Sequence, residues 1–179
     1  DTSYFQAPGR MNVYDEHPFK VILDYGHNPA ALGAMAELAD RMEIKGRRLC
    51  VVSMPGDRRD QDVVDAAAAL AGHFDHFICK ADDRRRGRGH DEIPQMLRQA
   101  LMQNGVDDTA ITVIPDEVEA VNAGLGMAAP GDLLVIFGDD TTRCWKQIIY
   151  FNAPGDQPKP KGSSATRQPV ATFEDMFDT

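Results

Sequence analysis

The stretch VILDYGHNPAAL, residues 21–32, joins a short apolar run to a polar turn and to the start of a second apolar pattern. Residues 21–23 are consecutively apolar, which is typical of a strand buried on both faces. Asn28 and Pro29 then have the side chains that suit an N-cap and a first helical turn. The stretch therefore predicts a buried strand that passes through a polar turn, residues 24–28, directly into a helix.

The same alternation of strand and helix patterns continues along the chain. Five apolar runs are typical of strands, and segments with apolar residues spaced three and four apart follow them. A short strand, MNVY, is expected before the first run. This alternation predicts an α/β fold: a three-layer, Rossmann-like, open and mostly parallel sheet with helices on both faces. The expected strands are FKVILDY, RRLCVVSM, DHFICKA, AITVIP and DLLVIFG, and the expected helices centre on residues 32–42, 63–71, 93–101, 118–125 and 144–149.

Composition narrows the class of protein. The chain has 179 residues, 42% hydrophobic and 26% charged, which is enough for one domain with an ordinary core. Its formal net charge of −9 argues against a general nucleic-acid binder. It has no apolar run of membrane-spanning length and no signal-peptide pattern, so we expect a cytoplasmic protein. The three cysteines lie in apolar runs and are expected to be buried, reduced thiols.

Domain organisation is expected to be simple. The chain begins with Asp1 rather than Met, so we expect a fragment or a processed chain. Residues 1–152 are expected to form one domain. Residues 153–179 are rich in Pro, Gly, Ser and Thr and have little periodicity, so they are expected to form a mostly disordered tail.

Three of the expected strands end in polar turns at one edge of the sheet. These are residues 24–28, PGDRRD at residues 55–60, and DDRRRGRGH at residues 82–90. Open α/β sheets bind ligands beyond the carboxyl ends of their strands, and arginines there can bind carboxylates or phosphates through paired hydrogen bonds. The aspartates could instead pair with these arginines or hold a cationic substrate. The alternative for each segment is a solvated turn whose own residues satisfy one another.

The first of these turns also has the chemistry of a nucleotide site. The helix after it presents unpaired N–H groups and a partial positive charge to an anion. Asp24, directly before it, could accept hydrogen bonds from the hydroxyls of a sugar. The sequence contains no GxxxxGK[ST] phosphate loop and no GxGxxG after the first strand, so this hypothesis depends on position alone.

Several segments resemble the C-terminal domain of the Mur ligase family, in particular its cyanophycin synthetase branch. DYGHNP resembles the family's Asp-Tyr-Ala-His-Asn/Thr-Pro motif at a strand end, and PGDRRD with a downstream RGR resembles the cyanophycin synthetase branch. The resemblance spans most of the chain before the expected tail. The matching segments are APGRMNVY, DYGHNPAAL, PGDRRD, DDRRRGRG and DLLVIFGDDTTRCWKQI.

The resemblance implies an ATP-dependent ligase that activates a carboxylate as an acyl phosphate, which an amine then attacks to form an amide. A cyanophycin synthetase would add arginine to the β-carboxylate of an aspartate in a growing poly-aspartate chain. The C-terminal domain would act as a lid over ATP and Mg²⁺, which the family's central domain mainly binds. The expected partners are arginine, an aspartate-containing peptide and the central and N-terminal domains of the same ligase, with a homo-oligomer left open. We expect the chain alone to bind nucleotide weakly and to catalyse nothing detectable.

The resemblance also implies roles for individual residues. Arg10 would reach the nucleotide phosphates and Asp24 would hold the ribose hydroxyls. His27 and Asn28 would shape the nucleotide pocket. No side chain is expected to act as a nucleophile or to ligate a metal, because acyl transfer through an acyl phosphate depends on orientation and charge stabilisation. The residues expected near the amine-bearing substrate are Asp57, Arg58, Arg59, Asp82, Asp83, Arg86 and Arg88.

Two alternatives stay open. The chain could belong to a Mur-type ligase for another substrate, a peptidoglycan precursor or a folylpolyglutamate. Against this, the peptidoglycan ligases usually carry an Asn-Pro-Arg motif where this chain has DDRRRGRG. The chain could also be a stand-alone, non-catalytic binding module, which the missing phosphate loop favours slightly.

Overall fold

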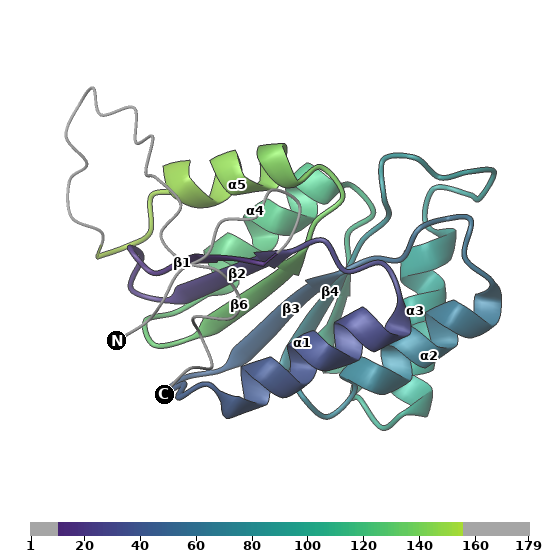
Figure 1. Cartoon of the computed structure of the whole chain (residues 1–179), viewed down its shortest axis with the longest axis horizontal. Coiled ribbons are helices and arrows are strands. Elements are labelled where there is room, and N and C mark those ends of the chain that lie inside the picture. The colour runs from purple at the N-terminus through teal and green to yellow at the C-terminus, as the bar shows by residue number, and fades with distance from the viewer. Residues whose placement is uncertain (1–10, 156–179) are drawn as a thin grey trace.

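The centre of the molecule is a six-stranded sheet with the order β1-β2-β6-β3-β4-β5 (Figure 1). The computed structural model describes residues 11–155. β1 is antiparallel to β2, and all other neighbouring strands are parallel. The strands are β1 Asn12–Tyr14, β2 Lys20–Asp24, β3 Arg48–Val52, β4 His76–Cys79, β5 Ile111–Val113 and β6 Leu133–Phe137.

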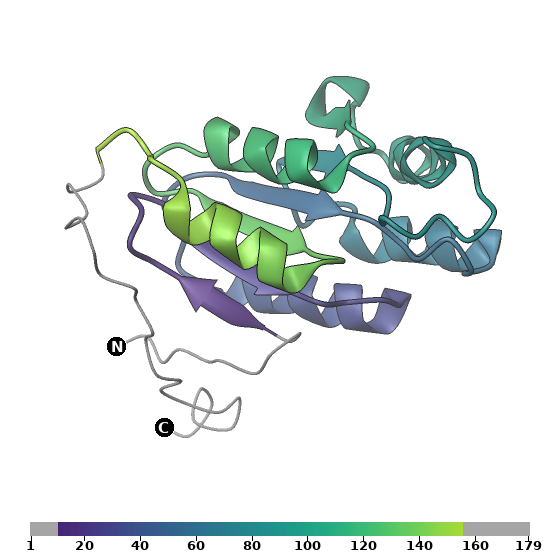
Figure 2. The same cartoon turned by 90° about the horizontal axis from the view of Figure 1, so that it is seen from above.

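Helices cover both faces of this sheet (Figure 2). On one face α1, α2 and α3 pack over alternate strand residues such as Ile22 and Phe77. On the other face α4 and α5 pack over the intervening residues, such as Leu23 and Ile78. The predicted α/β architecture is therefore confirmed. The helices are α1 Pro29–Arg41, α2 Asp60–Leu70, α3 Glu92–Gln103, α4 Glu117–Met127 and α5 Thr141–Tyr150, with a short 3-10 helix η1 at Asp108–Ala110.

Strand β6 is the last strand in the chain, yet it lies between β2 and β3. All five of its residues, LLVIF, are buried. Val135 lies opposite Ile22 of β2 and Cys50 of β3, and these three side chains belong to the same hydrophobic core. This insertion places the carboxyl ends of β2, β6, β3 and β4 next to one another.

Helix α1 begins where the sequence predicts. The side-chain Oδ1 of Asn28 accepts a hydrogen bond from the backbone N–H of Ala31 at 2.9 Å, and Pro29 is the first helical residue. The cap satisfies one of the backbone donors that a helix start leaves unpaired. Leu32, Met35, Ala36 and Ala39 lie on the buried face of the helix, which fixes its orientation on the sheet.

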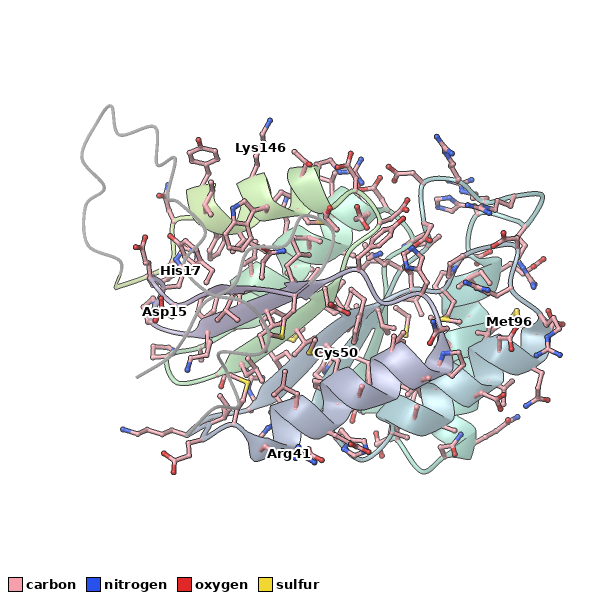
Figure 3. The ribbon with its side chains drawn as sticks, viewed as in Figure 1. Asp15, His17, Arg41, Cys50, Met96 and Lys146 are labelled. Carbon is pink, nitrogen blue, oxygen red and sulfur yellow. The ribbon has the colours of Figure 1, made fainter. Side chains whose placement is uncertain are left out.

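The three cysteines, Cys50, Cys79 and Cys144, are buried free thiols, as expected. Cys50 lies inside the body of the domain, in contrast to Lys146, whose side chain extends outward from α5 (Figure 3). Burial raises the pKa of Cys79 to about 12, so its thiol stays protonated at neutral pH. These side chains serve packing.

The predicted boundary between domain and tail, after residue 152, stays a prediction. Ala153 is buried and belongs to the core beneath α4 and α5. Most of the expected tail, residues 156–179, lies outside the described residues. Between residues 11 and 155, no helix combines the length and the apolar character needed to cross a bilayer.

Candidate functional site at the carboxyl edge of the sheet

Four neighbouring strands end at one polar edge of the sheet. Residues 25–28 follow β2, residues 138–140 follow β6, residues 53–59 follow β3 and residues 80–91 follow β4. The β4–α3 loop projects from this edge (Figure 1). The expectation that three polar segments share one edge is confirmed. The β6–α5 turn was not part of this prediction. It lies between the segment after β2 and the segments after β3 and β4.

Asp24 is the last residue of β2 and is half-buried. Burial raises the pKa of Asp24, although the backbone N–H groups of Tyr25 and Gly26 donate to its carboxylate and lower it. Its backbone oxygen accepts a hydrogen bond from the N–H of Gly138 at 2.9 Å, which ties this turn to the end of β6. Within residues 11–155 the Asp24 carboxylate has no ion-pair partner. It can therefore accept hydrogen bonds from the hydroxyl groups of a ligand.

Two rings lie beside this carboxylate. The ring of Tyr25 stands edge-on to the imidazole of His27, with centroids 3.6 Å apart and planes at 83°. Tyr25 is 41% exposed and so offers aromatic surface to a ligand. Asn28 uses its Oδ1 to cap α1, which leaves its amide N–H groups as donors. Tyr25 was missing from the predicted site, although it is part of the motif DYGHNP.

Arg88 joins the β3–α2 loop to helices α2 and α3. Its Nε donates to the backbone oxygen of Gly56 and its Nη2 to that of Arg58, both at 2.8 Å. Nη2 also pairs with Asp60 at 2.9 Å, and Nη1 pairs with Glu92 at 2.6 Å. All three side-chain nitrogens of Arg88 are thus engaged within the chain. The geometry gives Arg88 an organising role, and the substrate contact expected for it stays a prediction.

The backbones of the two loops also touch. A Cβ on Gly56 would overlap the backbone oxygen of Arg85, so glycine is required for this close approach. A turn closed by the N–H of Arg88 donating to the oxygen of Arg85 at 3.1 Å places Arg86 at its tip, with a φ of 49°. Arg86 pairs across the gap with Asp57. The two loops therefore form one continuous surface.

Three exposed arginines of this surface have no hydrogen-bond or ion-pair partner for their side chains within residues 11–155: Arg58, Arg84 and Arg85. Arg59, in contrast, pairs with Asp62 of its own helix at 2.9 Å. Unpaired guanidinium groups are available to the carboxylates or phosphates of a ligand. Arg84 and Arg85 were missing from the predicted set, although they belong to the same run of arginines as Arg86 and Arg88.

A buried ion pair lies beneath this edge. The side chains of Lys80 and Glu117 are fully buried, with Nζ and Oε2 2.8 Å apart. Lys80 also donates to the hydroxyl of Ser53 at 2.8 Å, and that hydroxyl donates to Asp82. The predicted residue Asp82 thus belongs to a hydrogen-bonded group that connects β3, β4 and α4.

Glu117 holds the β6–α5 turn as well. Its carboxylate accepts hydrogen bonds from the backbone N–H groups of Asp139 at 2.7 Å and Asp140 at 3.0 Å. Burial alone would raise the pKa of Glu117, but Lys80 and these N–H groups outweigh it and lower the pKa to about 2. Glu117 and Lys80 were missing from the predicted site. The available signal was a lysine that interrupts the apolar run FICKA directly before two aspartates, Asp82 and Asp83.

Asp83 has a cationic partner inside the chain. Arg143 of α5 donates from Nη1 to Oδ2 of Asp83 at 2.9 Å and from Nη2 to Oδ1 at 3.2 Å. Nη2 of Arg143 also pairs with Glu117 at 2.7 Å. The carboxylate of Asp83, which the sequence placed near the substrate, is therefore bound by a guanidinium of the domain itself.

Arg10 lies outside the described residues, so its expected contact with phosphates stays a prediction. Within the described part of the chain, no group of three or more His, Cys, Asp or Glu side chains is arranged to hold a metal ion. At the carboxyl edge of the sheet, the described residues supply carboxylates, guanidinium groups and an aromatic ring. These groups are suited to a polar ligand.

Comparisons with known proteins agree with this architecture. Residues 9–139 match the family described as Mur ligase, glutamate ligase domain. A cyanophycin synthetase from Crocosphaera subtropica is 38% identical over 147 residues, which are 82% of this chain but only 16% of that protein. The UDP-N-acetylmuramoyl-L-alanyl-D-glutamate–2,6-diaminopimelate ligase of Coxiella burnetii is 32% identical over 82% of this chain and 29% of its own length.

The fold is also found in solved structures. A structure of UDP-N-acetylmuramoyl-L-alanyl-D-glutamate–2,6-diaminopimelate ligase superposes with a TM-score of 0.57 and 27% identity, covering 73% of this chain and 26% of that one. The chain thus spans less than a third of each of these relatives. The family match covers most of the chain. The chain therefore belongs to the Mur ligase family, as a Mur ligase C-terminal domain.

Proposed function

We propose that this domain is the lid of an ATP-dependent amide ligase, a cyanophycin synthetase that joins arginine to the β-carboxylate of an aspartate-containing peptide. The observation that carries this proposal is the polar edge itself. Among residues 11–155 it places a carboxylate without a salt-bridge partner, Asp24, on the same sheet edge as three arginines whose side chains have none there: Arg58, Arg84 and Arg85. The similarity to cyanophycin synthetases supports this choice of substrate.

In the proposed reaction, the β-carboxylate of aspartate takes the γ-phosphoryl group of ATP, which forms an acyl phosphate and releases ADP. The amino nitrogen of arginine then attacks the carbonyl carbon, a C–N bond forms, the C–O bond to phosphate breaks, and the nitrogen loses a proton. Such a reaction needs orientation and charge stabilisation more than a protein nucleophile. A lid that carries these groups would complete the site when it closes.

On the nucleotide side, we assign Asp24 to the ribose hydroxyls and Arg10 to the phosphates. His27 and Asn28 would shape the pocket, and Tyr25 adds aromatic surface to it. The half-buried, unpaired carboxylate of Asp24 fits a role as a hydrogen-bond acceptor. Mg²⁺, which would neutralise phosphate charge when bound, is assigned mainly to other domains of the ligase.

On the substrate side, the β3–α2 and β4–α3 loops present both positively and negatively charged side chains. Unpaired guanidinium groups of Arg58, Arg84 and Arg85 suit the carboxylates of the peptide and of arginine. Carboxylates such as Asp57 and Asp82 could face the guanidinium group of the incoming arginine. Asp57 is exposed but paired with Arg86, so a ligand would compete for it.

A substrate panel tests the proposal. The complete ligase that contains this domain would be supplied with ATP, Mg²⁺ and an aspartate-containing peptide. ADP release would then be measured with arginine, diaminopimelate or glutamate, and a reaction without added amine provides the control. We expect ADP release and amide formation with arginine only. ADP release with glutamate only, or with none of the three amines, would contradict the proposal.

A second candidate is a ligase that adds diaminopimelate to a peptidoglycan precursor. It is favoured by the 32% identity with the diaminopimelate ligase of Coxiella burnetii over 82% of this chain. Turnover with diaminopimelate and a muramyl peptide acceptor, and none with arginine, would establish this candidate instead.

A further inference from the structure

Asp83 and Arg143 form a two-point ion pair at the root of the β4–α3 loop. The two hydrogen bonds, 2.9 and 3.2 Å long, join both guanidinium Nη atoms to both carboxylate oxygens. Such pairing through two parallel hydrogen bonds fixes the orientation of the carboxylate relative to the guanidinium group as well as the distance between them. The backbone N–H of Asp83 also donates to Oδ2 of Asp139 at 2.9 Å. Three hydrogen bonds thus hold the first part of this loop, one to the β6–α5 turn and two to the first turn of α5.

Arg143 is itself held from the interior. Its Nη2 lies 2.7 Å from Oε1 of Glu117, whose side chain is fully buried. Glu117 is in turn fixed by buried Lys80 and by two backbone N–H groups of the β6–α5 turn. A guanidinium anchored to a buried carboxylate loses little further freedom when it also binds Asp83. The Arg143 side chain is therefore set in place before any ligand arrives.

The same turn reaches the nucleotide side of the edge. Gly138 donates its N–H to the backbone oxygen of Asp24 at 2.9 Å. The β6–α5 turn thus contacts the β2–α1 turn on one side and the β4–α3 loop on the other. Arg84 and Arg85, which have no side-chain partner within residues 11–155, directly follow Asp83 in the chain. A fixed backbone at Asp83 therefore limits the positions that the backbones of these two arginines can take.

We propose that Arg143 is a positioning residue that, through Asp83, fixes the β4–α3 loop and its free arginines relative to the nucleotide-side turn. The inference deepens the proposed function and rests on it for the identity of the substrate. It also assigns Asp83 to the scaffold rather than to direct binding of a cationic substrate. A cationic ligand could bind Asp83 only by displacing a guanidinium that is already anchored to Glu117.

A double-mutant cycle separates these two roles. The complete ligase would carry Asp83→Asn, Arg143→Gln, or both, and KM for arginine, KM for ATP and kcat would be measured. If Asp83 acts through Arg143, each single variant raises KM for arginine by about 10- to 100-fold, as misplaced binding groups do. The double variant should then be no worse than Arg143→Gln alone, because the Asp83–Arg143 pair is already lost in each single variant. KM for ATP and kcat should change about twofold or less.

The opposite pattern would overturn the inference. If Asp83 binds the substrate directly, Asp83→Asn should raise KM for arginine strongly. Arg143→Gln should then leave KM for arginine unchanged or lower it. Additive effects of the two substitutions would contradict it as well. The Arg143→Lys variant keeps the charge beside buried Glu117 but loses the fork, so it tests the same point if Arg143→Gln does not fold. The Lys variant should raise KM for arginine in the same direction.

Amide hydrogen exchange on this chain gives a readout that is independent of catalysis. Arg143→Gln should speed exchange of the backbone amides in residues 82–90 by about tenfold or more, because local opening becomes easier. Arg98→Gln is the matched control, since it breaks another arginine–aspartate pair, with Asp108 at 2.6 Å. It should leave residues 82–90 unaffected.

The two proposals can fail separately. If the wild-type ligase does not use arginine, the proposed substrate is wrong, but the result of the hydrogen-exchange experiment still holds. Unchanged exchange in residues 82–90 of the Arg143→Gln chain would instead refute the positioning role, whatever amine the ligase uses.

Discussion

Asp24 shows how a single residue can be unfavourable for folding and still suit a binding site. Burial raises the pKa of this carboxyl above its usual value. For an acid the sign is clear: a raised pKa in the folded state means that the ionised side chain destabilises the fold above its normal pKa. Within residues 11–155 this carboxylate has no salt-bridge partner, which fits the ligand-binding role proposed for it.

We therefore predict opposite effects of Asp24→Asn on function and stability. In the complete ligase, KM for ATP should rise by about 5- to 150-fold, because a charged hydrogen bond of about 1–3 kcal/mol is weakened. The melting temperature of this chain at neutral pH should be unchanged or higher. Glu37→Gln, a substitution on the exposed side of α1, serves as the control for both measurements. An unchanged KM, or a clear loss of stability, would argue against a ribose contact.

Glu117, in contrast to Asp24, is an acidic residue whose ionised side chain stabilises the fold. Burial alone would raise its pKa, but Lys80 and backbone N–H groups outweigh it and lower the pKa from 4.5 to about 2. A lowered pKa contributes stability that is complete above the unfolded value and is lost as the pH falls through the folded value. The contribution is about 3 kcal/mol, and it should disappear between about pH 4.5 and pH 2.

Glu117→Gln should therefore be less stable than the wild type at pH 7 and should approach it as the pH falls toward 2. Urea unfolding of the two chains across this range measures the difference. Glu119→Gln, two residues further along α4 and exposed, is the matched control and should track the wild type throughout. A gap between Glu117→Gln and the wild type that does not change with pH would refute the assignment of the ion pair.

Sequence reasoning could identify residues whose role is local, and it missed those whose partners are distant in the chain. The capping role of Asn28 follows from its neighbours, because the bond it accepts comes from Ala31. The pairing of Lys80 with Glu117 depends on how α4 packs on the sheet, which no local pattern reveals. The same holds for Arg143, whose partners belong to α4 and to the β4–α3 loop.

At the scale of elements, the β3–α2 and β4–α3 loops act as one unit because Arg88 joins them. Arg88→Lys keeps the charge but cannot reach the oxygens of Gly56 and Arg58 together with Asp60 and Glu92. We predict a loss of about 1–3 kcal/mol of stability, measured by urea unfolding of this chain. Arg84→Lys, at a position whose side chain has no partner in the described part of the chain, should leave the stability within experimental error.

The same variant separates the two roles considered for Arg88. If Arg88 organises the loops, stability falls together with a rise in KM for arginine in the complete ligase. If it binds the substrate directly, KM rises while the stability of the chain stays at the wild-type level. The second outcome would contradict the organising role.

The strands and helices themselves were predictable, because each carries its own apolar period. The order of strands was not, since periodicity does not say that β6 inserts between β2 and β3. That insertion brings the β6–α5 turn into the middle of the polar edge. The short helix η1 was also missed, because three residues held by the Asp107 cap are too few to show a period.

At the scale of the whole molecule, the proposed function makes this domain one side of a shared site. Its described residues supply groups that suit ribose and carboxylates, and the chain spans 16% of the cyanophycin synthetase from Crocosphaera subtropica. We therefore predict that the chain alone binds ATP weakly and produces no detectable ADP with arginine and an aspartate-containing peptide. Calorimetry and an ADP-release assay on the purified chain test this. Turnover by the chain alone would refute its assignment as a lid.

The central claim is that this domain works as one part of a larger ligase. The most direct test is the size of the native polypeptide, measured by blotting extract of the source cells with serum raised against this chain. We expect a band far larger than the 19.7 kDa of the chain, since the chain spans only 16% of the cyanophycin synthetase from Crocosphaera subtropica. A single band at the size of the chain itself would show that the domain is not part of a larger ligase.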